Sequence, residues 1–137
     1  MTIAVDVAAP SRAASRTGWV LSGILILFLV VDGAIKLVPI QVVLDTMAEL
    51  GWPADPTKAR ILGVLTLGCT ILYAVPRTSV LGAILLTGYL GGAMATHMRI
   101  DNPLFSHLLF GLYLGVIAWG GLWLREPRLR ALIPFKS

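Results

Sequence analysis

The sequence predicts an all-α, polytopic membrane protein with a four-transmembrane-helix bundle and a short amphipathic helix between helices 1 and 2. Hydrophobic residues make up 57% of the 137-residue chain and charged residues only 13%, about half of the roughly 25% typical of soluble domains. Four apolar stretches are each long enough to cross a hydrocarbon core about 30 Å thick. Basic residues flank these stretches, as membrane topology requires, so the net charge of +4 is no indication of nucleic-acid binding.

The first predicted span covers residues 19–38 and contains Asp32 and Lys36, which lie on one helix face because they are four residues apart. Pro39 ends this helix. In residues 40–50 the apolar side chains recur every three or four positions, which predicts a short amphipathic helix in the membrane surface. The other spans are predicted at residues 59–75, 79–97 and 104–124.

The predicted domain organisation is a tail at residues 1–17, a transmembrane domain at 18–124 and a basic tail at 125–137. Four spans place both termini on one side of the membrane. The basic residues predicted on that side are Arg12, Arg16, Arg77, Arg125, Arg128, Arg130 and Lys136. Those on the other side are Lys36, Lys58, Arg60 and Arg99. The positive-inside rule therefore predicts that both termini are cytoplasmic.

Glycines spaced four residues apart occur in the third and fourth spans. Such spacing lets helix backbones approach closely in lipid. We expect these glycines to pack helices tightly within the chain, with homodimerisation as the alternative. The predicted packing residues are Gly88, Gly91, Gly92, Gly111 and Gly115.

The ionisable groups that are not simple topology charges gather, under this topology, at the extracytoplasmic helix ends. The ligand-binding candidates are Asp32, Lys36, Tyr89, His97, Arg99 and His107. Ionisable residues inside a membrane are expensive and mark functional sites. For Asp32 and Lys36 two interpretations stay open: an intrahelical ion pair that ends the span, or a carboxylate that faces the bundle interior and binds a proton or ligand.

The two histidines are ten residues apart across a turn, so we expect them to approach each other. Their structural interpretation is hydrogen bonding to Asp32 or to backbone carbonyls, and the alternative is a proton relay or small-ligand site. Arg99 is expected to pair with Asp101 or to bind an anionic headgroup or carboxylate. No metal site is predicted, because the ligand spacings of known metal motifs are missing. A single cysteine, Cys69, excludes an intrachain disulfide.

Several segments resemble the DoxX-like family of small four-helix bacterial membrane proteins. They are Asp32-Gly-Ala-Ile-Lys36, Leu50-Gly-Trp-Pro53, the run from Leu85 to Arg99, Pro103-Leu-Phe-Ser-His107 and Gly120-Gly-Leu-Trp-Leu-Arg125. The likeness covers the chain from about Trp19 to Pro134. If the family motif marks a site, the resemblance implies Gly91, Gly92, Thr96, His97, Arg99 and His107 as its residues.

The resemblance implies a bacterial inner-membrane location and an accessory or anchoring subunit of a quinone-linked redox assembly. Such a subunit has a membrane oxidoreductase as its partner, a quinone contact and no catalytic centre of its own, and no cofactor is established. One alternative is a small-molecule or lipid binder or transporter with a polar pocket at the extracytoplasmic helix ends. The other is a membrane enzyme that uses His97 or Asp32 as acid or base. Homo-oligomerisation is a further alternative for the partner.

Overall fold

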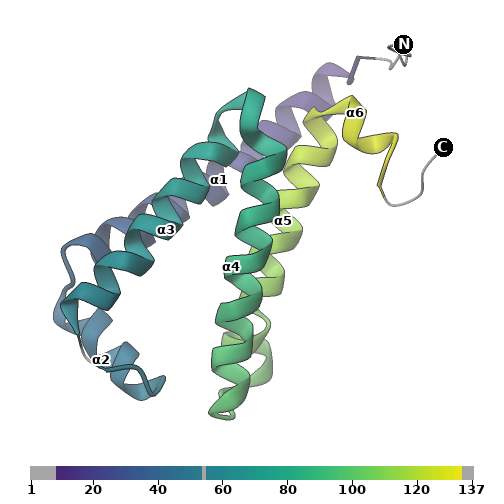
Figure 1. Cartoon of the computed structure of the whole chain (residues 1–137). Helices are drawn as coiled ribbons and strands as arrows, with labels where there is room; N and C mark the ends of the chain where they lie inside the picture. Colours follow the sequence, from purple (N-terminus) through teal and green to yellow (C-terminus); the bar gives the residue numbers. More distant parts are fainter. Residues whose placement is uncertain (1–8, 54, 134–137) are drawn as a thin grey trace, which may run out of the picture.

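The structure is a computed structural model that describes residues 9–53 and 55–133 (Figure 1). In these ranges all regular secondary structure is helical. Four helical stretches are long and apolar enough to cross a membrane, which confirms the predicted fold class. Their α-helical parts are α1 (Arg12–Leu37), α3 (Pro56–Ala74), α4 (Ser79–Arg99) and α5 (Phe110–Arg125).

Short helices complete the fold. The predicted amphipathic helix is α2 (Gln41–Glu49), and its buried side chains Val43 and Met47 pack with Ala59 of α3. Three further short elements lie at the other connections: η1 (Pro76–Thr78), the π-helical η2 (Leu104–Leu108) and α6 (Pro127–Arg130).

Side-chain caps set where α1 and α3 begin. The Ser11 hydroxyl accepts a hydrogen bond from the Ala14 N–H, so α1 begins well before residue 19, inside the predicted tail. The Asp55 carboxylate accepts one from the Thr57 N–H, and Pro56 occupies the first turn of α3. Residues 1–8 of the predicted N-terminal tail and residues 134–137 of the predicted basic tail lie outside the described residues.

Each of the four long helices packs against two others: α1 against α3 and α5, and α4 against α3 and α5. Glycines bring the backbones together. A Cβ on Gly18 would lie 2.6 Å from the carbonyl oxygen of Gly121, and a Cβ on Gly63 would lie 2.9 Å from that of Gly33. Between α3 and α4, a Cβ on Gly82 would lie 2.2 Å from a backbone nitrogen. Only glycine permits these three approaches.

The glycines that the sequence singled out behave differently, and four of the five do not pack against a neighbouring helix of this chain. A Cβ on Gly88, Gly91, Gly92 or Gly115 would meet no atom within 4 Å. Only Gly111 lies at a close contact, where a Cβ would be 3.0 Å from the carbonyl oxygen of Leu90. The four-residue spacing places small residues on one helix face, but it does not specify whether that face turns toward a neighbouring helix.

A buried relay of hydrogen bonds joins α5, α1 and α3. The Arg125 Nε–H donates to the Ser22 Oγ at 3.1 Å, and the Tyr73 hydroxyl donates to the Ala118 carbonyl oxygen at 2.7 Å. Since that bond uses the only phenolic proton, the Ser22 hydroxyl donates to the Tyr73 oxygen, 2.9 Å away. Ser22 and Tyr73 are fully buried. We call these four residues the serine–tyrosine relay.

The Arg125 guanidinium also reaches the remaining long helix. Its Nη1 lies 3.5 Å from the Ser79 Oγ at the start of α4. The guanidinium carbon is 4.1 Å from the centroid of the Trp19 ring and 5.3 Å from that of Tyr73, which places the cation over both aromatic rings. The sequence assigned Arg125 to the basic tail as a topology charge. The structure corrects this, because the residue ends α5 and contacts the other three long helices.

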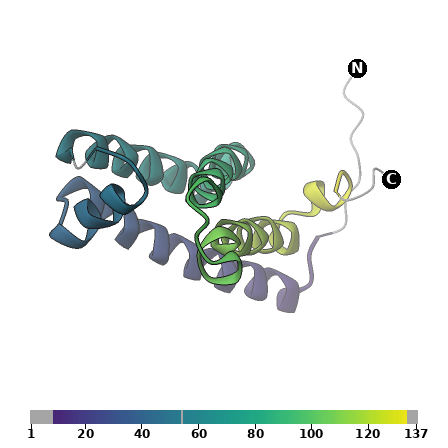
Figure 2. The same cartoon turned by 90° about the horizontal axis from the view of Figure 1, so that it is seen from below.

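The pair α1 and α3 meets the pair α4 and α5 where the relay lies, and α3 and α4 diverge at the other end. Figure 1 shows α3 and α4 close together at the connection that joins them and separating toward α2. Viewed from below in Figure 2, α4 and α5 appear nearly end-on while α1 and α3 run across the view. The two helix pairs therefore cross at a large angle.

Replacing Tyr73 by Phe removes the donor to Ala118 and the acceptor of the Ser22 hydroxyl. Because both partners are buried, we expect the free energy of unfolding to fall by about 1–3 kcal/mol. Unfolding in mixed micelles with rising denaturing detergent measures the change. Tyr113→Phe is the matched control, since Tyr113 is 41% exposed and its hydroxyl bonds no other described residue. Equal losses in the two variants would contradict the role of the relay.

Candidate functional site

A groove of about 620 Å³ opens between α2 and α4, in the space where the helix pairs diverge. Its volume lies in the range of about 300–1,000 Å³ that is typical of small-molecule sites. We call it the α2–α4 groove. It is lined by Asp32, Ile35, Lys36, Val42, Val43, Thr46, Met47, Leu50, Trp52, Leu62, Gly88, Tyr89, Gly92, Ala93, Thr96 and His97.

Three of the α4 residues that line the groove have little or no side chain. Gly88, Gly92 and Ala93 line it, and a Cβ on either glycine would still meet no neighbour. The facing wall is α2, whose Val43 and Met47 are held by packing against α3. Gly88 and Gly92, which the sequence predicted to bring helices together, thus leave space unfilled beside α4.

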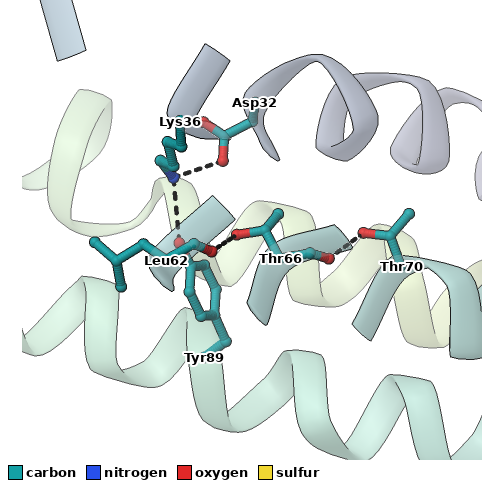
Figure 3. A network of polar contacts seen from close by, with 6 residues as sticks. All are labelled: Asp32, Lys36, Leu62, Thr66, Thr70 and Tyr89. Atoms are coloured by element: carbon teal, nitrogen blue, oxygen red, sulfur yellow. Dashed lines mark hydrogen bonds and ion pairs between the residues drawn. The ribbon is translucent and has the colours of Figure 1, made fainter. Parts of the chain in front are cut away.

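The polar centre of the groove is the pair predicted from α1, joined by a residue of α4 (Figure 3). The Lys36 Nζ donates to the Asp32 Oδ2 at 2.6 Å and to the Tyr89 hydroxyl oxygen at 3.2 Å. The side chains of Lys36 and Asp32 are 21% and 27% exposed. The Lys36–Asp32 pair, within α1, is the one salt bridge among residues 9–53 and 55–133, and the bond from Lys36 to Tyr89 links α1 to α4.

The threonines of α3 near this centre are already satisfied. Figure 3 shows the Thr66 and Thr70 hydroxyls directed along their own helix, where they donate to the carbonyl oxygens of Leu62 and Thr66. Such back-bonding satisfies a buried hydroxyl without a partner on another helix. The one polar contact that the described residues of another helix make with this pair is therefore the Tyr89 hydroxyl of α4, which accepts from Lys36.

The two histidines do approach each other, with ring centroids 5.8 Å apart in an edge-on arrangement. His97 lines the α2–α4 groove, whereas His107 is exposed and does not. The expected bond to Asp32 is wrong, because Lys36 occupies that carboxylate. Instead the His97 Nδ1 lies 2.7 Å from the Asn102 Nδ2, and the His107 Nδ1 lies 2.7 Å from the Ser106 Oγ.

A tight reversal at the end of α4 places Asn102 beside the His97 ring. Asp101 has a φ of 54°, in the left-handed region. The Asp101 N–H donates to the Met98 carbonyl oxygen, and the Asn102 N–H donates to that of His97. This is a Schellman motif, in which aspartate occupies the position usually taken by glycine. The side chains of Asp101 and Asn102 do not cap the following helix, whose N-cap is Pro103.

Arg99 does not pair with Asp101, which corrects the expected ion pair. Its Nη2 donates to the Leu50 carbonyl oxygen at 2.6 Å. Leu50 ends α2 and is followed by Gly51, whose φ of 79° forms a second Schellman motif. A Cβ on Gly51 would lie 2.7 Å from the Arg99 Nη2. Arg99 therefore ties the end of α4 to the end of α2.

The geometry favours binding over acid–base or metal chemistry. Among the described residues, no three His, Cys, Asp or Glu side chains are grouped closely enough to hold a metal ion. Asp32 and His97 share no hydrogen bond, so no carboxylate–imidazole pair is formed for proton transfer. Cys69 carries a free, half-buried thiol on α3. What the groove offers is an apolar wall with one charged, hydrogen-bonded centre.

The sequence model of the DoxX-like family matches residues 20–121. The chain belongs to the DoxX-like family. Within the matched region lie α2, α3 and α4, and with them the whole α2–α4 groove. No curated protein and no solved structure matches the chain.

The residues that the family resemblance singled out divide between two places. Gly92, Thr96 and His97 line the α2–α4 groove, while Gly91 and His107 lie outside it. Tyr89, Asp32 and Lys36 form the polar centre. The apolar lining from α2, and Trp52 shortly after it, was missed as part of a site. The sequence did contain the amphipathic pattern of α2, but this pattern does not show that its apolar side chains face α4.

Replacing Arg99 by Met keeps the apolar stem but removes the bond to Leu50. We expect amide hydrogen exchange at Gly51 and Trp52 to accelerate about fivefold, because a hydrogen bond contributes about 1 kcal/mol to closing the loop. Exchange mass spectrometry in detergent measures it. Arg77→Met is the control, since Arg77 is exposed at the opposite end of α4. Unchanged exchange in Arg99→Met would show that Arg99 does not fasten the loop.

Proposed function

We propose that this DoxX-like membrane protein binds a membrane-dissolved small molecule in the α2–α4 groove. The observation that carries the proposal is the combination of a 620 Å³ groove with one charged, hydrogen-bonded centre among apolar walls. Sites for small molecules are typically apolar with a few placed polar groups that orient the ligand. An apolar ligand body would lie between α2 and α4, with its head at Lys36 and Tyr89.

The proposed setting is the bacterial cytoplasmic membrane with both termini in the cytoplasm. The support is the distribution of basic residues, seven toward the termini against four toward the other side. In that orientation α2 and the groove lie in the extracytoplasmic half of the bilayer. A ligand dissolved in the outer leaflet would then reach the groove laterally, without crossing the membrane.

Filling the groove tests the proposal. Gly92→Leu places a side chain in the groove, and Gly91→Leu places the same side chain on the neighbouring position of α4, which does not line the groove. Because a Cβ at either glycine meets no atom within 4 Å, both variants should fold. We expect native mass spectrometry from nanodiscs to show a bound small molecule with the unmodified chain and Gly91→Leu, and to lose it with Gly92→Leu. Retention by Gly92→Leu would contradict binding in the groove.

A second candidate function is the accessory subunit of a quinone-linked redox assembly, which is what the wider family suggests. The supporting observation is an apolar hollow of about 330 Å³ on the face shared by α4 and α5. Gly91 and Gly115 line it, and each leaves room for an added Cβ. Small residues on an open face let a further transmembrane helix approach closely. A quinone carbonyl would find its hydrogen-bond donors at Lys36 and Tyr89.

Blocking this hollow distinguishes the two functions. If a membrane oxidoreductase docks there, Gly115→Leu should abolish its copurification after gentle detergent extraction, whereas Gly92→Leu should leave it intact. Copurification is read by mass spectrometry of the proteins retained with the tagged chain. Extraction of the unmodified chain without an oxidoreductase would count against the accessory role and would leave the groove proposal standing.

A further inference from the structure

We infer that the α2–α4 groove selects an uncharged ligand whose head carries a hydrogen-bond acceptor, such as a ketone or ester carbonyl, and rejects carboxylate and ammonium heads. This inference rests on the proposed function and specifies its ligand class. It follows from the charges at the polar centre of the groove and from the protons that remain unused there.

The charges cancel within the groove. Asp32 and Lys36 line it together, and their charged atoms are 2.6 Å apart. An anionic head at Lys36 would meet the Asp32 carboxylate, and a cationic head at Asp32 would meet the Lys36 ammonium. Either ion would enter an apolar space without a net counter-charge, which is strongly unfavourable. An uncharged head avoids this cost.

Hydrogen-bond donors remain at the same place. The Lys36 ammonium carries three protons. Its hydrogen bonds to Asp32 and Tyr89 use two of them, which leaves one. The Tyr89 hydroxyl accepts from Lys36, and its own proton is donated to no other described residue. Both groups line the groove. A carbonyl oxygen can accept from either donor.

A third donor lies further along α4. The Asn102 amide nitrogen can only donate, so the His97 Nδ1 accepts and the proton of the neutral imidazole is on Nε2. His97 also lines the groove. The hydroxyls of Thr46 and Thr96, in contrast, donate to carbonyl oxygens of their own helices, and Oδ1 of Asp32 remains an acceptor. The strongest unused donors thus lie on Lys36, Tyr89 and His97.

Four probes that share one hexadecyl chain test the inference in nanodiscs by native mass spectrometry: a methyl ketone, a carboxylate, an ammonium and the bare alkane. We expect the ketone to be retained at least about tenfold better than each of the others. Tyr89→Phe should reduce retention of the ketone about fivefold, the effect of losing one hydrogen bond, and leave the alkane unchanged. Tyr113→Phe, outside the groove, should change neither.

The pair itself is tested by Asp32→Asn, which keeps the shape but leaves Lys36 as an uncompensated cation. In this variant the carboxylate probe should become the best retained of the four. If the unmodified chain retains the carboxylate or the ammonium as well as the ketone, the selectivity is overturned while binding in the groove survives, as Gly92→Leu would show by losing all probes. If no probe is retained by any variant, the proposed function itself fails.

Discussion

The serine–tyrosine relay is the interaction on which the arrangement of the long helices depends. In lipid, the hydrophobic effect does not press apolar helices together, so polar contacts and close packing must hold them. Tyr73 and Ser22 are fully buried, and each hydroxyl both donates and accepts. Through Arg125 the relay also reaches α4, so one connected network joins α1, α3, α4 and α5. Removing any member would leave a buried polar group without its partner.

The position of the relay explains the shape of the molecule. It lies near the start of α4 and the end of α5, where glycine contacts such as Gly18 with Gly121 also bring backbones together. Toward α2 no comparable contact joins α3 to α4 among the described glycines, and the two helices diverge (Figure 1). The α2–α4 groove is the space that this divergence leaves, and α2 forms its outer wall.

Polar groups at the two ends of the molecule have different roles. At the relay, an arginine and hydroxyls bond one another across tightly packed helices, which is a structural arrangement. At the groove, Lys36 and Asp32 are partly exposed and line an open volume, and Lys36 has a proton left over. An ion pair beside empty space can orient a ligand, whereas one in a filled core cannot. The hydrogen bond from the Arg99 side chain to the Leu50 carbonyl oxygen keeps the end of α2 beside α4, so α2 remains in place as the outer wall of the groove.

The sequence by itself determined the elements: four membrane-length helices, the amphipathic α2 and the pairing of Asp32 with Lys36. These depend on hydropathy and on spacing within one helix, which are local properties. Only the tertiary structure decided which side chains meet across helices. When a helix is apolar on all sides, its sequence does not specify which face packs against a neighbouring helix. For this reason the sequence predicted Arg125 as a topology charge, although it bonds to a neighbouring helix. For the same reason it predicted Gly88 and Gly92 as packing residues, although they line the groove.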